Sequence, residues 1–557
     1  MPRLVECVPN LSDGRNQHVI QAIAQAISSV SGVKLLDVDP GADTNRTVYT
    51  FVGEPEAVQN AAVNVAHAAA EHIDMRAHKG AHPRIGAMDV CPFVPVADVT
   101  MAECVEMAHA VGRRIADDLR VPVYFYEHAA SSPTRRSLAD IRAGEYEGLQ
   151  EKLRDPAWQP DCGPAHFDAG YGATIVGARD FLLAYNVNLN TRDRRLAHEI
   201  ALTIREAGRA KRDADGRIVR GTDGQPVRVA GRLPRVRAIG WYIEEYRQAQ
   251  VSINLLDYKT TPLHTVFEVV CEEAAKLGLR VTGSELVGMT PRQPISEAGR
   301  YYLRRQGKST GASLAELMEI AVRSLGLDQI APFDVNKKII EAHFEPEAPL
   351  GSMTVARFVD EVASEAPAPG GGSVAALAGS LGSALVALVA NVTVGRPGFE
   401  AVSPALCAEA ERAQALKARL ATLMDEDTRA FMDVVAARRL PKSTPAEEEA
   451  AARAIESALQ RAASVPREVM RLSLEALRLA RATAERGNPH AVSDAGVAGL
   501  MARAGVEGAA LNVLINLVAI QDERFTRESR DEVAQARADA VRLMAALAQE
   551  LERRGVV

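Results

Sequence analysis

The feature that most constrains the fold of this chain is a change of sequence pattern near residue 350. Before that point, short apolar runs rich in β-branched and aromatic residues alternate with segments whose apolar residues recur at helical spacing. Beyond the proline-containing stretch 330–351, strand-like runs give way to alanine-rich segments, a composition that favours helix. We therefore predict an α+β part followed by a separate all-α helical-bundle domain.

The α+β part is predicted to contain two similar α/β-layer subdomains. At 557 residues the chain is too long for one hydrophobic core. The alternation of expected strands and helices in the first 180 residues is repeated in the next 150. We therefore place the subdomains at 1–180 and 181–330, a linker at 331–350 and the helical domain at 351–557, and we expect a ligand-binding groove between the two subdomains.

The individual elements follow from the same patterns. Expected strands lie at 4–8, 33–38, 47–52, 89–95, 122–126, 173–176, 181–188, 237–243, 250–255 and 280–287. Expected helices lie at 18–29, 55–73, 101–119, 192–206, 262–277, 354–363, 374–392, 407–438, 446–486, 493–522 and 523–553. Residues 146–162 are expected to form a polar loop, and residues 208–234 a long exposed loop or β-hairpin.

Composition argues against several functional classes. The formal net charge of −7 gives no basic footprint for a nucleic acid. The six cysteines form no CxxC pair and are expected to be reduced thiols of a cytoplasmic protein, and the N-terminal residues lack the apolar core of a secretory signal. Residues 374–394 carry no charge, but their small and polar residues favour a buried bundle helix over a membrane span, so no membrane partner is expected.

The densest cluster of ionisable residues lies at 78–95, where His78, Lys79, His82 and Arg84 precede an apolar strand. Glycines and a proline within the cluster oppose a helix, so it is expected to be a loop, where chemistry is often placed. Two histidines four residues apart bind metal when a helix presents them together, and without that helix no metal site is predicted.

His82 has three interpretations: a metal ligand, a residue that caps a turn, and a general base. We favour the base, because the pKa of imidazole lies near neutrality. Lys79 and Arg84 could then hold an anionic substrate. Asp39, at the end of an expected strand, is the candidate carboxylate that orients the ring, with an Asx-turn as the alternative.

Two glycine-rich segments are candidate binding loops, because glycine lets backbone N–H groups approach a flat or anionic ligand. The first consists of Gly163, Pro164, Ala165, His166, Phe167, Asp168, Ala169, Gly170, Tyr171 and Gly172, with an inter-subdomain linker as the alternative. The second consists of Gly370, Gly371, Gly372 and Ser373, ahead of an expected helix whose N-terminus could bind a phosphate or carboxylate. It lacks the Lys-Ser/Thr pair of a P-loop, so nucleotide binding is not predicted.

Candidate acids also occur in the helical part. Asp425 and Asp427 are two residues apart on an expected helix and so face different sides of it. One of them can point inward, where burial would raise its pKa and make it a usable acid; the alternative is that both are solvated. Asp494 is a second candidate carboxylate, although Ser493 and Asp494 together also suit a plain helix cap.

With these residues laid out, the whole of 1–557 resembles the formiminotransferase-cyclodeaminase family. In the first half the resemblance rests on residues 37–39, 44–53, 78–93, 172–179 and 186–189. In the second half it rests on residues 369–374, 425–427, 440–442, 487–488, 493–494 and 512–517.

The resemblance implies a bifunctional folate enzyme of histidine degradation. One part would transfer the formimino group from N-formimino-L-glutamate to tetrahydrofolate, a co-substrate that can carry a polyglutamate tail, and no metal or redox cofactor is expected. The other would convert 5-formiminotetrahydrofolate into 5,10-methenyltetrahydrofolate and ammonia. By matching position, His82 would be the transferase base tuned by Asp39, and Asp427 the cyclodeaminase acid.

The resemblance also implies a homo-oligomer in which each domain pairs with its own kind, with residues 374–391 and 512–517 as plausible contact faces. Two alternatives remain open at this stage: a transferase of formyl rather than formimino groups, and a scaffold protein with one inert domain. The near-ultraviolet absorbance of methenyltetrahydrofolate would distinguish them.

Overall fold

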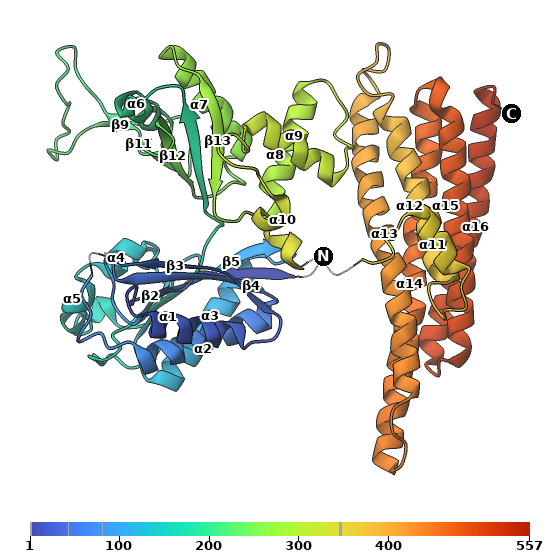
Figure 1. Cartoon of the computed structure of the whole chain (residues 1–557), viewed down its shortest axis with the longest axis horizontal. Coiled ribbons are helices and arrows are strands. Elements are labelled where there is room, and N and C mark those ends of the chain that lie inside the picture. Colours follow the sequence, from blue (N-terminus) through green and yellow to red (C-terminus); the bar gives the residue numbers. More distant parts are fainter. Residues whose placement is uncertain (1–2, 43, 81, 345–347, 557) are drawn as a thin grey trace. The chain divides into compact units, whose positions relative to one another are not determined.

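The computed structural model describes residues 3–42, 44–80, 82–344 and 348–556. Among these, the residues up to 295 together with 325–344 form one compact unit, and residues 296–324 together with 348–556 form a second. The predicted fold class is confirmed, because the first unit layers helices on β-sheets and the second is helical (Figure 1).

The first unit begins with a seven-stranded mixed sheet. Its strands are β1 (Leu4–Cys7), β2 (Asn10–Leu11), β3 (Val33–Gly41), β4 (Arg46–Gly53), β5 (Met88–Ala97), β6 (Val123–Glu127) and β7 (Thr174–Ala178). β1 pairs antiparallel with both β4 and β5, and β3 pairs antiparallel with β4. β7 lies between β5 and β6 and runs parallel to both, so the carboxyl ends of these three strands meet at one edge of the sheet.

The two faces of this sheet are covered differently. Three helices lie together along one face, α1 (Gln17–Ser28), α2 (Pro55–His72) and α3 (Met101–Leu119) (Figure 1). Alternation along β5 sends Cys91 and Phe93 into this core. On the other face, Val90 packs with residues of two short helices, α4 (Leu138–Arg142) and α5 (Glu145–Lys152). This second face carries the candidate transferase site.

A second, four-stranded antiparallel sheet follows, in the order β11 (Val236–Ile243), β12 (Gln248–Leu255), β8 (Leu183–Leu189) and β13 (Val281–Val287). Helices α6 (Arg194–Ile204) and α7 (Leu263–Lys276) pack against it. The hairpin predicted for residues 208–234 is confirmed by the pairing of β9 (Arg209–Ala210) with β10 (Arg228–Val229).

Some local predictions are wrong. Residues 145–152 form α5 rather than a loop. The helix was not expected because its sequence has no apolar residues repeating at helical spacing, and Leu149 is its one fully buried residue. Helices α8 (Arg292–Arg305) and α9 (Leu314–Leu325) were not expected. Ser493 does not cap α15, because that helix begins at Val492 without a side-chain cap.

Short helical turns complete the chain: Pro133–Arg135, Pro156–Trp158, α10 (Val335–Lys338), Ile340–Phe344, Pro489–Ala491 and Leu517–Ala519.

The second unit is built around α12. Besides α9 and most of α8, its helices are α11 (Val355–Val362), α12 (Gly371–Asn391), α13 (Ser403–Arg438), α14 (Pro445–Arg486), α15 (Val492–Asn516) and α16 (Glu523–Arg553). Small residues let α12 approach its neighbours closely: a Cβ atom at Gly379 would overlap Ser473 Oγ of α14, and one at Gly382 would lie 2.9 Å from the Ala498 carbonyl oxygen of α15. α12 is therefore a core helix.

Within the described residues, two helical segments are long and apolar enough to cross a membrane by length and composition alone. They are Gly371–Asn391 and Pro489–Ala519, and 67% and 44% of their most apolar windows are buried in the protein. A core helix of a bundle passes the same test, and the packing of α12 is of that kind.

The packing around α12 yields a prediction. Gly379→Val should lower the free energy of unfolding of the helical unit by about 1–3 kcal/mol, because the larger side chain must displace Ser473 or Leu420. Val541→Ala, on α16 and half exposed, is the control and should change it by about 0.5 kcal/mol or less. Denaturant unfolding followed by circular dichroism measures both, and equal effects would contradict the packing argument.

Candidate active sites

His82 lies on the loop between α2 and β5, beside Arg46 at the start of β4. Arg46 Nη1 lies 3.0 Å from His82 Nε2. A guanidinium group only donates hydrogen bonds, so Nε2 must accept and the ring proton must reside on Nδ1. Burial and the Arg46 and Arg142 charges lower the pKa of His82 to about 4, and a hydrogen bond with the Pro83 backbone acts in the opposite direction. His82 is therefore a neutral imidazole at pH 7.

Two arginines from different elements flank this imidazole. Arg46 also donates to Asn10 Oδ1 of β2 at 2.8 Å. Arg142 of α4 pairs with the carboxylate of Asp89, which is buried at the start of β5 and also accepts a hydrogen bond of 2.9 Å from the Ile85 backbone N–H. The Nε atoms of both arginines are buried and have no hydrogen-bond partner among the residues that the structure describes.

The rest of the loop is held by His78 and Arg84. Arg84 Nε donates to His78 Nδ1 at 3.1 Å, and His78 Nε2 lies 2.9 Å from the Asn45 carbonyl oxygen. Arg84 is itself buried and pairs with Glu145 and Glu147 of α5. Both ring nitrogens of His78 are thus engaged by protein groups. Among the described residues no cluster of three or more His, Cys, Asp or Glu side chains is arranged to hold a metal ion.

Asp39 lies in β3, exposed to solvent and in register with Val48 of β4. Among the described residues no hydrogen bond joins it to His82. Burial and the charge of Arg142 lower the pKa of Arg46, the residue that contacts the imidazole, and the negative charges of Asp89 and Asp39 act in the opposite direction.

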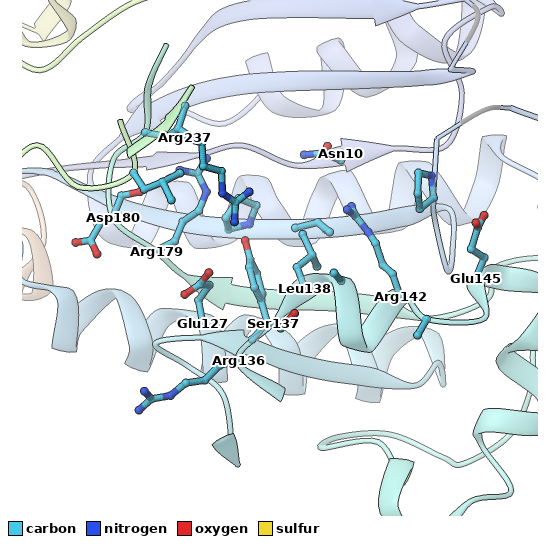
Figure 2. Close-up of a pocket in the computed structure, with 18 of the residues that line it drawn as sticks. Asn10, Glu127, Arg136, Ser137, Leu138, Arg142, Glu145, Arg179, Asp180 and Arg237 are labelled. Carbon is cyan, nitrogen blue, oxygen red and sulfur yellow. The ribbon is translucent and has the colours of Figure 1, made fainter. Parts of the chain in front are cut away.

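A cavity of about 900 Å³ opens next to this cluster (Figure 2). Arg142, Arg179 and Arg237 reach it from α4, the end of β7 and β11, so both sheets of the first unit contribute to its walls. The basic side chains that line it are Arg46, Arg136, Arg142, Arg179, Arg235 and Arg237, and the acidic ones are Glu127, Glu145 and Asp180. The excess of arginine suits a ligand with carboxylate groups.

Residues 163–172 do not line this cavity. Residues 163–166 are exposed, and Phe167 packs against the ring of Tyr146 with centroids 5.4 Å apart. Asp168 stabilises a turn by accepting from the N–H groups of Gly170 and Tyr171. Asp168, Gly170 and Tyr171 instead line a separate depression with residues at the end of α2.

The second candidate site lies at the N-terminus of α12. Asp427 of α13 directs its carboxylate at the first turn of α12, where a Cβ atom on Gly372 would overlap both carboxylate oxygens. Ser373 Oγ lies 3.4 Å from Asp427 Oδ2 and 2.9 Å from the Met424 carbonyl oxygen. Burial raises the pKa of Asp427, while hydrogen bonds with the side chain and backbone of Ser373 act in the opposite direction.

The other candidates in the helical unit have different environments. Asp425 is buried, accepts a hydrogen bond of 3.0 Å from the Leu350 backbone N–H, and has an unpartnered Oδ2. Asp427 is shielded too, so the alternative in which both carboxylates are solvated is wrong. Asp494 lies partly exposed in the first turn of α15. Asn512 lies across from Gly371, where a Cβ atom would be 3.5 Å from its Nδ2.

Sequence reasoning missed the arginines of the cavity. Arg46 and Arg179 fall within motifs that carried the family resemblance, but nothing in their spacing assigned them a role. They converge with Arg142, Arg235 and Arg237 only after folding, because these residues come from β4, α4, the end of β7 and the start of β11.

Family models match nearly the whole chain. Residues 4–179 match the N-terminal subdomain of the formiminotransferase domain, residues 184–345 the formiminotransferase domain, and residues 354–535 the model described as formiminotransferase-cyclodeaminase. Together with a candidate site in each unit, these matches define the class of protein: a bifunctional folate enzyme with a transferase part and a cyclodeaminase part.

Curated relatives give the particular family. The chain is 44% identical over 558 residues to the formimidoyltransferase-cyclodeaminase of Rattus norvegicus, covering 100% of both chains. It is 37% identical to the glutamate formimidoyltransferase of Streptococcus pyogenes serotype M1, over 62% of this chain and 99% of the relative. It is 40% identical to the methenyltetrahydrofolate cyclohydrolase of Methylorubrum extorquens, over 34% of this chain and 91% of the relative. The chain therefore belongs to the formimidoyltransferase-cyclodeaminase family.

The contact between Gly372 and Asp427 yields a prediction. Gly372→Ala should push the Asp427 carboxylate out of place and slow cyclodeamination by about 100-fold or more, while leaving formimino transfer unchanged. Gly370→Ala is the matched control, because open space surrounds that position and its φ of −136° suits any residue. Each step is assayed separately with its own substrate. Equal loss in the two variants would show that the turn needs glycine for another reason.

Proposed function

We propose that His82 is the general base of the transferase and Asp427 the general acid of the cyclodeaminase. As a member of its family, the protein transfers the formimino group of N-formimino-L-glutamate to tetrahydrofolate and then closes the product to 5,10-methenyltetrahydrofolate with release of ammonia. The observation that carries the assignment is the state of the two groups: a neutral imidazole beside an arginine-lined cavity, and a shielded carboxyl group against the first turn of a helix.

In the transferase step, N5 of tetrahydrofolate attacks the formimino carbon and His82 accepts the proton that N5 loses. The bond between that carbon and the glutamate nitrogen then breaks, and the proton returns from His82 to the departing amine. The products are 5-formiminotetrahydrofolate and glutamate. The arginines of the cavity hold the carboxylates of formiminoglutamate and of the folate tail, because guanidinium groups pair with carboxylates in a bidentate manner. Asp39 acts on His82 through the charge of Arg46.

In the cyclodeaminase step, N10 attacks the same carbon and the bond from that carbon to the terminal nitrogen breaks. This nitrogen carries one hydrogen; it receives one proton from Asp427 and the proton that N10 loses, and it leaves as ammonia. Burial supports this role because it raises the pKa of Asp427 and so keeps more of the acid protonated near neutral pH.

The glycine-rich segments take different parts in this proposal. The depression beside Asp168 and Tyr171 is proposed to receive part of the folate, through residues 163–172. Gly372 and Ser373 lie beside Asp427 and are proposed to present its carboxyl group to the folate bound there, while Gly370 and Gly371 lead into this turn of α12. We also propose the domain boundaries at residues 180, 330 and 350 and a cytoplasmic location.

The two assignments are tested together. His82→Ala should slow formimino transfer by about 10²–10⁴-fold yet leave cyclodeamination of supplied 5-formiminotetrahydrofolate unchanged. Asp427→Asn should leave transfer intact and let 5-formiminotetrahydrofolate accumulate, because an amide cannot supply the proton. The near-ultraviolet band of the methenyl product and chromatography of the intermediate report the two steps. Parental rates in both variants would refute the assignments, and parental protein that is active in one step alone would favour the inert-domain alternative.

We further propose that the helical units of two chains pair with each other. On α15, Leu511, Ile515 and its continuation Val518 are 61%, 68% and 75% exposed, an unusual state for large apolar side chains. Val374, Leu381 and Leu388 are also exposed, at seven-residue spacing on α12, which packs against α15. Two apolar helices with exposed rows of this kind suit a contact between copies.

Ile515→Arg should therefore shift the protein to a smaller assembly, because a charge would be buried in the contact. Val541→Arg on α16 is the matched control, since Val541 is also exposed but lies outside these rows. Sedimentation velocity measures the mass of each variant. A parental mass for Ile515→Arg would remove this face from consideration.

A further inference from the structure

The hydrogen bond between Arg46 and His82 poses a problem for catalysis. While Arg46 Nη1 donates to Nε2 at 3.0 Å, the lone pair that should accept a proton from the attacking nitrogen is occupied. Nδ1 carries the ring proton and cannot accept either. The imidazole has the protonation state of a base but lacks a free acceptor atom.

Arg46 has a better partner within reach of the cavity. Its side chain lines the cavity wall, and within the described part of the chain its buried Nε has no hydrogen-bond partner. Its two present acceptors, the Asn10 amide oxygen at 2.8 Å and the imidazole, are both neutral. A carboxylate accepts from guanidinium about twice as strongly as a neutral group does, and it can take two donors at once.

Other charged groups around His82 already have partners. Arg142 from α4 is paired with Asp89 from β5, and Arg84 and His78 of the same loop bond to each other and to neighbouring residues. These residues, with Arg46 from β4, are the charged and titratable groups that face the imidazole from the described elements around it. Arg46 is the one among them that bonds to the imidazole itself.

We propose that Arg46 is a specificity-determining residue that makes the availability of His82 depend on a ligand carboxylate. A carboxylate entering the cavity takes the donors of Arg46, and the released Nε2 accepts the proton from the attacking nitrogen. The chemistry recognised is a carboxylate, which either the formimino donor or the glutamate tail of folate can supply. The inference rests on the proposed role of His82 as the base.

The kinetic test compares substrates with and without carboxylates at saturation. Formamidine replaces formiminoglutamate in one arm, and the amide of tetrahydropteroate, which has neither the glutamate tail nor a free carboxylate, replaces tetrahydrofolate in the other. In the parental enzyme, one of the two truncated substrates should lower kcat by about 10- to 100-fold. It is the substrate that lacks the carboxylate by which Arg46 is drawn away from His82. Arg46→Gln should reduce the ratio of kcat between the full and the truncated substrate to less than about tenfold. Parental kcat with both truncated substrates would overturn the inference.

A binding test removes the chemistry altogether. In protein labelled with ¹⁵N-histidine, glutarate should raise the titration midpoint of His82 in the parental chain. Arg46→Gln should raise that midpoint without ligand by about one pH unit, because a neighbouring positive charge is lost. Arg46→Met, which also removes the charge but keeps a long unbranched side chain, provides a second variant if the first does not fold. Midpoints unchanged by glutarate in the parent, or by either folded variant, would overturn the inference.

A control separates this effect from substrate binding and from the role of His82. Arg237→Gln alters the same cavity at a residue that does not contact His82, so it should raise KM while preserving both the discrimination in kcat and the His82 midpoint. If His82→Ala retains transfer, the proposed function fails. If His82→Ala is inactive while Arg46→Gln keeps the parental discrimination, this inference alone fails.

Discussion

The candidate transferase site depends on a guanidinium group that is held against a neutral imidazole. Partial burial of the ring disfavours the charged form of His82, and the two arginines close to it act in the same direction. The surrounding structure stabilises this arrangement through Asn10, which accepts from Arg46, and Asp89, which pairs with Arg142. Each of these residues comes from a different part of the first sheet or from the helix after it, so the sheet must form before the site can exist.

The helical unit reaches a comparable result with small residues rather than with charges. Glycines along α12 allow neighbouring helices to approach, and at Gly372 the missing side chain leaves room for a carboxylate from α13. The same feature that makes α12 look like a membrane segment, a long run of small and apolar residues, is what a closely packed core helix requires. The composition of α12 therefore has a single physical cause, the need for close approach.

Much of the fold follows from local signals. Helix α3 begins with a capping box between Thr100 and Glu103, and strands such as β4 and β5 are rich in residues that favour strands, so both kinds of element can be predicted from the sequence. Helix α5 was missed because it is short and buries little apolar surface, so its position depends on ion pairs from Glu145 and Glu147 to Arg84, which lies about sixty residues earlier in the chain.

The two candidate catalytic residues could also be predicted from the sequence, but the residues around them could not. His82 and Asp427 lie in dense clusters of chemically capable residues and could be proposed from the sequence alone. The contact of His82 with Arg46 could not, because it joins residues 36 positions apart through a turn whose geometry depends on Asn45 at a positive φ of 48°. The cavity arginines are further separated still, and only the folded sheet brings them together.

The placement of Asp427 at the start of α12 has an energetic consequence for turnover. The first turn of a helix has backbone N–H groups without internal partners and a partial positive charge, so it favours an anion. If Asp427 is the acid, as proposed, the carboxylate left after proton transfer is a stronger cap for α12 than the neutral acid. Proton release would then stabilise the first turn of this core helix, and reprotonation of the acid for the next cycle would weaken that cap again.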